Sequence, residues 1–274
     1  MGPSNATPAL GRVALEARRA ELEAERGEPM TLDSLTAGFA MFQRRRGHRH
    51  STDDLTTAWY AVTHAPSSPT KLLDLGTGIG SVGLSVLWKF PDAELTAIEV
   101  QAVSYPLLRE NVEANGLDAR VTTIHGDLRH FMPEPVFELV TGSPPYFDVS
   151  DGIVSADSQR AAARFELHGD VRDYCAAARR ALAPNGHFIF CFPTPQIERA
   201  LDACKMHGLS IRSRCDVVPK VGLAPLFTLF WTMKEEDAAG APTTMEPPLV
   251  VRDDGGAHTA EMLRVRQTFG FAMS

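Results

Sequence analysis

Short apolar runs alternate with longer helix-like stretches from residue 71 onward, and this order restricts the possible fold more than any other feature. A strand, a helix and a second strand in succession favour a parallel sheet with right-handed crossovers. Two further runs follow each other without a helix, which predicts an antiparallel edge hairpin. The expected class is α/β: a mostly parallel seven-stranded sheet with helices on both faces. Strands are expected at 71–75, 94–100, 120–125, 137–141, 187–192, 211–217 and 226–233, and helices at 81–90, 105–115, 170–182, 197–207 and 259–266.

Four parts are expected along the chain. Residues 1–30 form an N-terminal arm, partly disordered or helical. Within it, 12–26 is rich in Ala, Glu and Arg but poor in apolar residues, which favours a solvated helix or a frayed arm. Residues 31–70 are expected to cap the substrate and cofactor, and 71–234 to form the catalytic domain. Residues 235–274 are expected to be a linker and an accessory tail.

Composition excludes some classes of protein. The net charge of −7 argues against a broad, non-specific polyanion binder but not against a local basic groove. The four cysteines include no Cys-x-x-Cys pair and have no histidine at ligand spacing, so neither a metal site nor a disulfide framework is expected. No apolar run approaches the roughly 20 residues of a membrane span, and no signal peptide is recognised. We therefore expect a cytoplasmic protein without a membrane partner.

A glycine-rich turn, Asp74-Leu75-Gly76-Thr77-Gly78-Ile79-Gly80, separates the first strand from the next helix. A dinucleotide-binding turn has Gly-x-Gly-x-x-Gly, whereas these glycines are evenly spaced and follow an acidic residue. A pyrophosphate favours bare N–H groups, and an ammonium group favours a carboxylate. The turn therefore favours S-adenosyl-L-methionine, with Asp74 near the methionyl ammonium group.

Acidic residues also end the next two strands. Glu99 can accept hydrogen bonds from both ribose hydroxyls, an arrangement that NAD-binding domains share. Asp127 is placed to accept from the adenine amine, while Val100 and Leu128 can sandwich the ring. The alternative is that both carboxylates are solvated residues at strand ends.

The loop Ser143-Pro144-Pro145-Tyr146 follows the fourth strand. Each proline fixes its own φ, and Pro145 holds Pro144 extended, so the loop is stiff. Ser143 and the Pro144 carbonyl can then accept hydrogen bonds from one NH2 group and turn its nitrogen lone pair toward a methyl donor. Tyr146 is expected to stack on the ring that carries the amine. The alternative is a proline-rich surface turn.

Together these motifs resemble the class I S-adenosyl-L-methionine-dependent methyltransferases, and they are most similar to the bacterial tRNA1(Val) adenine-N6 methyltransferase group. The resemblance covers about 36–234, including Phe42-Gln43 and Thr52-Asp53. It implies a Rossmann-like fold and a catalytic loop of Ser143, Pro144, Pro145 and Tyr146. The implied cofactor-binding set is Thr52, Asp53, Asp74, Gly76, Thr77, Gly78, Gly80, Glu99, Val100, Asp127, Leu128 and Ser143.

Ser143 departs from that group, which usually has asparagine at this position. A hydroxyl is shorter than an amide and both donates and accepts, but it can still take one N–H. The change weakens the assignment to one particular tRNA and counts against a protein glutamine as substrate. Methylation of an exocyclic amine remains the expectation.

A basic run at 44–50 stands out in an otherwise acidic chain. Arginines beside phosphates supply much of the affinity for nucleic acid, although a solvated charge run is the plain alternative. A base in folded RNA would have to be splayed out to reach Ser143. No role is assigned to His125, His168 or His187. The expected substrate-binding residues are Arg44, Arg45, Arg46, Arg49, Phe147, Arg160 and Arg164.

The leading hypothesis is an enzyme that methylates N6 of adenine in structured RNA such as tRNA. One alternative keeps the chemistry but changes the acceptor to DNA, a protein glutamine or a small molecule. Another is a non-catalytic module that binds cofactor or RNA. The oligomeric state is left open.

Overall fold

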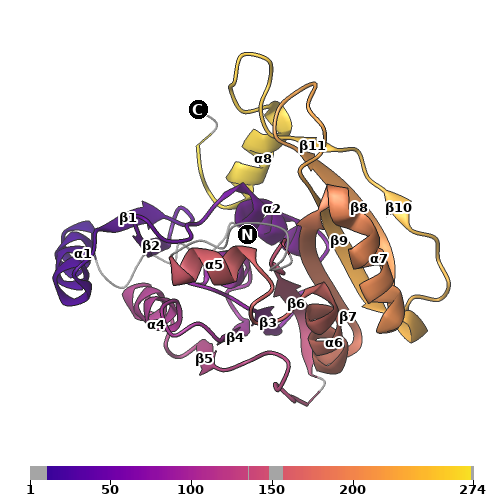
Figure 1. Cartoon of the computed structure of the whole chain (residues 1–274), viewed down its shortest axis with the longest axis horizontal. Coiled ribbons are helices and arrows are strands. Elements are labelled where there is room, and N and C mark those ends of the chain that lie inside the picture. Colours follow the sequence, from indigo (N-terminus) through magenta and orange to yellow (C-terminus); the bar gives the residue numbers. More distant parts are fainter. Residues whose placement is uncertain (1–10, 135, 148–156, 273–274) are drawn as a thin grey trace.

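The computed structural model describes residues 11–134, 136–147 and 157–272, except for the side chains of 162–164. Its centre is one twisted sheet with strand order β10-β8-β9-β7-β6-β3-β4-β5, to which β11 adds beside β8 (Figure 1). Five neighbouring strands are parallel: β3 (Lys71–Leu75), β4 (Glu94–Glu99), β5 (Val121–His125), β6 (Phe137–Gly142) and β7 (Leu182–Pro193). The antiparallel edge is β8 (Leu209–Val218) and β9 (Phe227–Lys234).

All seven expected strands are present, but the sheet has nine. The two additional strands are β10 (Thr244–Met245) and β11 (Leu249–Val250), which pair with β8. Such short strands carry no readable alternation of apolar and polar residues, so their pattern could not predict them.

Helices cover both faces of the sheet (Figure 1). One face packs against α2 (Thr52–Thr63), α3 (Ser81–Lys89) and α4 (Tyr105–Ala114), and the other against α6 (Val171–Ala181) and α7 (Ile197–Met206). Strand β7 shows why: Phe188, Phe190 and Phe192 point into the core below α6 and α7. Ile189 and Cys191 point into the core below α2. A covered parallel sheet buries both sides of its strands.

Strand β7 begins earlier than expected. The sequence Pro184-Asn185-Gly186 predicts a turn before a strand at 187, and this prediction is wrong because β7 starts at Leu182. The pairing with β6 jumps between Leu182 and His187, so the three residues form an irregularity inside the strand. Asn185 absorbs it with φ of 57°, which asparagine tolerates better than most residues.

The N-terminal part is more firmly packed than expected. Helix α1 (Arg12–Arg26) buries Leu15 and Leu22, and Arg18 makes two hydrogen bonds to Glu110 of α4, at 2.7 and 3.1 Å. The expected helix at 12–26 is present, and only the alternative of a frayed arm is wrong. A hairpin of β1 (Met30–Ser34) and β2 (Ala40–Arg44) follows. Asn111 fixes the hairpin, since its side chain accepts from Phe42 N at 2.7 Å and donates to the Ile79 carbonyl.

The tail after β9 returns to the core. Helix α8 (Ala260–Thr268) packs against α2, and Phe269 is fully buried. Glu246 accepts a hydrogen bond from Tyr60 of α2 at 2.7 Å and lies 3.1 Å from His64 Nε2. Helix α2 is therefore held in place by residues near the C-terminal end of the described chain. The remaining elements are α5 (Ser158–Arg164), η1 (Thr194–Gln196) and η2 (Glu235–Asp237).

None of the helices in the described ranges is both long and apolar enough to span a membrane.

Candidate active site

A cleft opens at the carboxyl ends of β3, β4, β5 and β6, where the strand order changes direction. Ligands of open α/β sheets bind at this point. The cleft encloses about 850 Å³ of empty space with its open mouth included. Its walls include the expected residues Gly76, Thr77, Gly78, Glu99, Val100, Leu128, Ser143 and Pro145.

Asp74 holds the glycine loop after β3 in place through hydrogen bonds, but it is not itself part of the cleft wall. One carboxylate oxygen accepts from Thr77 Oγ at 2.6 Å and Gly83 N at 3.0 Å, and the other accepts from Thr141 Oγ at 2.7 Å. Asp74 is 2% exposed and does not line the cleft, and burial raises the pKa of its carboxyl. The expected role beside the methionyl ammonium group is corrected: this carboxylate shapes the loop from behind.

Gly76 and Gly78 share a left-handed backbone, with φ of 61° at each, but have different surroundings. A Cβ on Gly76 would lie 2.0 Å from the Tyr174 hydroxyl, whereas a Cβ on Gly78 would meet nothing within 4 Å. Gly80 also has positive φ, but it packs against Leu84 and is not part of the cleft wall. Gly76 is therefore required by packing, and Gly78 leaves space open to the cleft.

These surroundings predict different costs for two alanine substitutions. Each substitution should lower the free energy of unfolding by about 1–2 kcal/mol, because alanine disfavours the left-handed backbone conformation. Gly76→Ala should lose about 1–3 kcal/mol more because Tyr174 is overpacked. Urea unfolding of the two variants measures the difference, with Gly78→Ala as the matched control. Equal losses would contradict the packing argument.

Glu99, at the end of β4, forms the floor of one end of the cleft. Glu99 is 3% exposed, and its carboxylate accepts hydrogen bonds from Gly78 N at 2.8 Å and Gln101 N at 2.7 Å. Burial raises the pKa of Glu99 despite these donors. Val100 and Leu128 line the walls on either side of this floor.

Asp127 was expected to accept from an adenine amine, but it is not part of the cleft wall. Arg129 binds both of its carboxylate oxygens, at 2.5 to 3.0 Å, and this pairing lowers the pKa of Asp127. In this structure the Asp127 carboxylate is paired with a neighbouring guanidinium instead of lining the cleft, so the structure does not support the expected contact with adenine.

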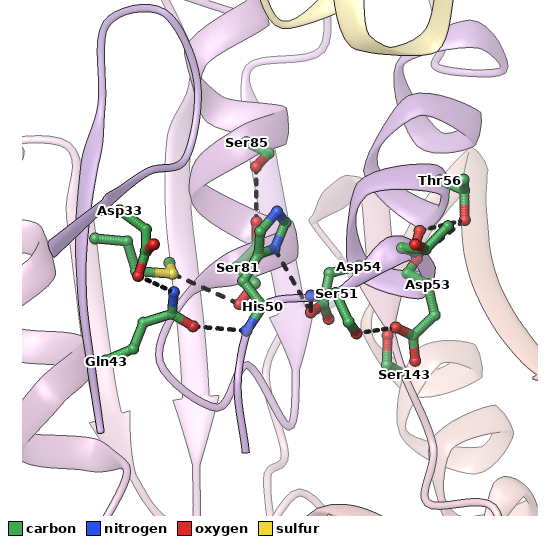
Figure 2. Close-up of polar contacts among 12 residues, drawn as sticks. Asp33, Gln43, His50, Ser51, Asp53, Asp54, Thr56, Ser81, Ser85 and Ser143 are labelled. Atoms are coloured by element: carbon green, nitrogen blue, oxygen red, sulfur yellow. Dashed lines mark hydrogen bonds and ion pairs between the residues drawn. The ribbon is translucent and has the colours of Figure 1, made fainter. Parts of the chain in front are cut away.

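At the start of α2, the residue that lines the cleft is not one of those expected to bind the cofactor. Thr52 is exposed, and neither Thr52 nor Asp53 lines the cleft, whereas Asp54 and His50 do. The Asp54 carboxylate accepts from Ser51 N at 3.0 Å and lies 3.6 Å from His50 Nδ1 (Figure 2). Burial would raise the pKa of Asp54, but His50 and the Ser51 N–H together bring it below its usual value.

Asp53 points from α2 toward the catalytic loop. Its carboxylate accepts from the Tyr146 hydroxyl at 3.2 Å and also from the Ser51 hydroxyl. Burial and the charge of Asp54 raise the pKa of Asp53. Asp54 is therefore the more acidic member of this pair, and Asp53 fastens α2 to the loop.

The Ser143-Pro144-Pro145-Tyr146 loop follows β6 directly, and Ser143 and Pro145 face the cleft. Tyr146 differs from the expectation of a stacking surface in the cleft. Its ring packs against the core, and its hydroxyl reaches Asp53 and Cys191. Gln196 of η1 holds the loop from the other side by donating to the Tyr146 carbonyl at 2.9 Å. In this structure Tyr146 anchors the loop.

The expected basic contacts separate into paired and exposed arginines. Arg44 is bound by Glu28, at 2.8 Å to each oxygen, and by Asp157 at 2.9 Å, so its role as a phosphate contact is corrected. Arg49 pairs with Asp33 at 3.0 Å. Arg45 and Arg46 are exposed.

The substrate contacts expected after the catalytic loop also have different surroundings from one another. Arg160 of α5 is exposed and donates to the Arg46 carbonyl at 2.5 Å, which places it beside the exposed arginines. Phe147 packs at 5.9 Å from the Phe165 ring. Arg164 ends α5, but its side chain lies outside the described part of the structure.

Several wall residues were missed by the sequence interpretation. His168, to which no role was assigned, lines the cleft, and His48 was interpreted only as part of the basic run. Gln159 of α5 is different, because the sequence already suggested it, with Arg160 and Arg164, for a wall over the substrate base; it lines the cleft and donates to Ser104 Oγ at 3.0 Å. Tyr174 fills the space that Gly76 leaves. The missed residues come from distant segments, and no local pattern marks them.

The residues present fit S-adenosyl-L-methionine. The glycine loop leaves the space beside Gly78 open, and Glu99 lies where ribose hydroxyls can be bound. Gln101 Oε1 is a buried acceptor in the wall that finds no donor among the described residues. No metal-binding group of His, Cys, Asp and Glu occurs within the described ranges.

Solved structures share this architecture. A predicted O-methyltransferase from Agrobacterium tumefaciens superposes with a TM-score of 0.62 at 18% identity, covering 81% of this chain and 98% of that one. M. jannaschii TYW2, solved in complex with AdoMet, superposes with a TM-score of 0.51 at 16% identity, covering 75% and 85%. The fold is Rossmann-like, and the cleft lies at its switch point.

The chain belongs to the methyltransferase small domain family, whose model matches residues 50–196. The predicted fold class, enzyme class and cofactor are thereby confirmed. A tRNA1(Val) (adenine(37)-N6)-methyltransferase from Glaesserella parasuis is 26% identical over 74% of this chain and 83% of its own length. Proteins of the same name from Vibrio vulnificus and Aeromonas hydrophila are 28% and 33% identical, over 86% and 54% of this chain and 94% and 60% of their own lengths.

Proposed function

We propose that this chain transfers a methyl group from S-adenosyl-L-methionine to N6 of adenine in structured RNA such as tRNA. The observation that carries the proposal is the position of the Ser143-Pro144-Pro145-Tyr146 loop, whose first residue faces the cofactor cleft. The names of the curated relatives support the choice of adenine in tRNA. A tRNA substrate would also place the protein in the cytoplasm.

The cofactor supplies an electrophilic methyl group when bound, so the protein has to align a nucleophile more than to create one. Ser143 Oγ and the Pro144 carbonyl would accept the two N–H groups of the adenine amine. These hydrogen bonds draw the nitrogen lone pair out of conjugation and toward the donor. Because the two prolines make the loop stiff, both acceptors stay in place and little conformational entropy is lost when the adenine binds.

The cleft residues divide into two groups for the two ends of the cofactor. Glu99 and Gln101 would bind the ribose, and Val100 and Leu128 would flank the adenine ring. Asp54 takes the role first expected for Asp74: its ionised carboxylate lines the cleft and would face the methionyl ammonium group.

Labelled S-adenosyl-L-methionine and total RNA from a strain lacking this protein provide the direct test. We expect label in N6-methyladenosine after nucleoside analysis, confined to one tRNA fraction. A protein that binds the cofactor by calorimetry yet labels no RNA would overturn the proposal. Label in DNA, protein or small molecules would then identify one of the other acceptors.

Arg45 and Arg46 are the exposed arginines of the basic run, and Arg160 lies against the Arg46 carbonyl. We propose that they contact RNA phosphates. Replacing both Arg45 and Arg46 with glutamate should raise the KM for RNA at least about tenfold. The slope of the logarithm of the binding constant against the logarithm of the salt concentration should become shallower by about one for each lost phosphate contact. Cofactor affinity should not change.

Arg264→Glu is the matched control for this prediction, since Arg264 is an exposed arginine on α8. Filter binding over a series of salt concentrations measures the slope for each variant. If the double variant binds RNA with the slope of the wild-type protein, the basic run is a solvated charge cluster.

A further inference from the structure

Cys191 lies directly behind the catalytic loop. It is on β7, on the side of the sheet that faces α2, and is fully buried. Its sulfur is 3.6 Å from Ser143 Oγ, within the range of a hydrogen bond from a thiol, and 3.4 Å from the Tyr146 hydroxyl oxygen. The sequence indicated no metal or disulfide role for the cysteines, and the proposed chemistry does not yet use Cys191.

Ser143 needs such a neighbour for a chemical reason. An asparagine at this position would present a carbonyl oxygen that only accepts, whereas a serine hydroxyl rotates and can donate or accept. A hydroxyl that turned its proton toward the amine would oppose the N–H groups instead of binding one. For Ser143 to act as an acceptor, its rotation has to be fixed from the protein side.

The thiol of Cys191 meets this need. It donates to Ser143 Oγ and thereby occupies one of the two oxygen lone pairs from the side away from the cleft. Burial and the nearby charge of Asp53 raise the pKa of Cys191 to about 11, so the thiol keeps its proton at neutral pH. Tyr146 uses its own proton on Asp53 and limits the movement of the sulfur.

We propose that Cys191 is a positioning residue for methyl transfer, whose thiol fixes the Ser143 hydroxyl so that its free lone pair faces the amine in the cleft. The inference rests on the proposed function. It explains how serine performs here the task of an asparagine carbonyl. It adds a residue of β7, remote in sequence from the loop, to the determinants of catalysis.

Substitutions at Cys191 test this role. Cys191→Ala should lower kcat about fivefold, the value of one ordinary hydrogen bond, with unchanged calorimetric affinity for S-adenosyl-L-methionine and an unchanged KM for RNA. Cys191→Ser keeps a donor of similar size and should restore most of the rate. In a Ser143→Ala background, Cys191→Ala should cause no further loss, because its target is already absent.

The double-substitution cycle separates positioning from a general structural role. If the two losses multiply, or if kcat follows the thermal midpoint across Ala and Ser at position 191, the inference is overturned. It is also overturned if Cys191→Ala turns over at the wild-type rate while Ser143→Ala is impaired, and the proposed function then stands. If the wild-type protein labels no RNA, the proposed function fails and the inference fails with it.

Discussion

Ser143→Ala is expected to lower kcat for RNA methylation about 100-fold or more, the typical cost of removing one well-placed hydrogen bond to a reacting group. Ser143 faces the cleft at the end of β6, and two prolines hold its backbone. Without its oxygen, the amine keeps one N–H unbound and its lone pair stays conjugated. Single-turnover transfer from labelled cofactor measures the effect.

The binding of the cofactor should survive this change, because the rest of the cleft wall is intact. Ser85→Ala is the matched control: its hydroxyl is buried on α3, bonds to the Ser81 carbonyl and lies outside the cleft wall. The control should turn over like the wild-type protein. Wild-type turnover by Ser143→Ala would show that the Pro144 carbonyl alone orients the amine.

Glu99→Gln is expected to weaken the binding of S-adenosyl-L-methionine about 100-fold, which corresponds to ~2–3 kcal/mol for lost charge-assisted hydrogen bonds. The Glu99 carboxylate already accepts from Gly78 N and Gln101 N, so it both shapes the pocket and would bind the ribose. An amide has one acceptor oxygen and places an NH2 group against one of these backbone donors. Calorimetric titration gives the change in Kd.

Asp127→Asn makes the same chemical change at the end of the neighbouring strand. Arg129 binds the Asp127 carboxylate outside the cleft wall, so this variant should bind the cofactor like the wild-type protein. Equal weakening in both variants would return Asp127 to the adenine-binding role that the sequence suggested and would weaken the assignment made from the structure.

The sequence predicted the sheet well because its signals are local. The strand at 71–75 matches β3 at both ends, and the glycine turn after it has the positive φ values that glycine permits. Glu99 reaches the cleft because the carboxyl ends of parallel strands meet at one edge. The start of β7 was misjudged because Pro184-Asn185-Gly186 has the composition of a turn, whereas pairing of β7 with β6 on both sides makes these residues an irregularity inside the strand.

Two of the errors at the site, those at Asp74 and Arg44, come from contacts between segments that are separated in the chain. Asp74 is saturated by Thr141 and Gly83, and Arg44 by Glu28 and Asp157, and nothing near either residue in the sequence indicates these partners. Carboxylates and guanidinium groups look equally available in a sequence whether they bind a ligand or each other. Only the assembled fold shows which of them remain exposed to the cleft.

The attachment of the tail to α2 has a consequence for the timing of synthesis. Helix α2 carries Asp54 at the cleft, yet it rests on α8 and bonds to Glu246, which are translated long after it. A nascent chain that still has this tail inside the ribosome has not yet formed the contacts that support α2. We therefore expect the enzyme to become competent only when the tail has emerged, so that incomplete chains on polysomes do not hold S-adenosyl-L-methionine.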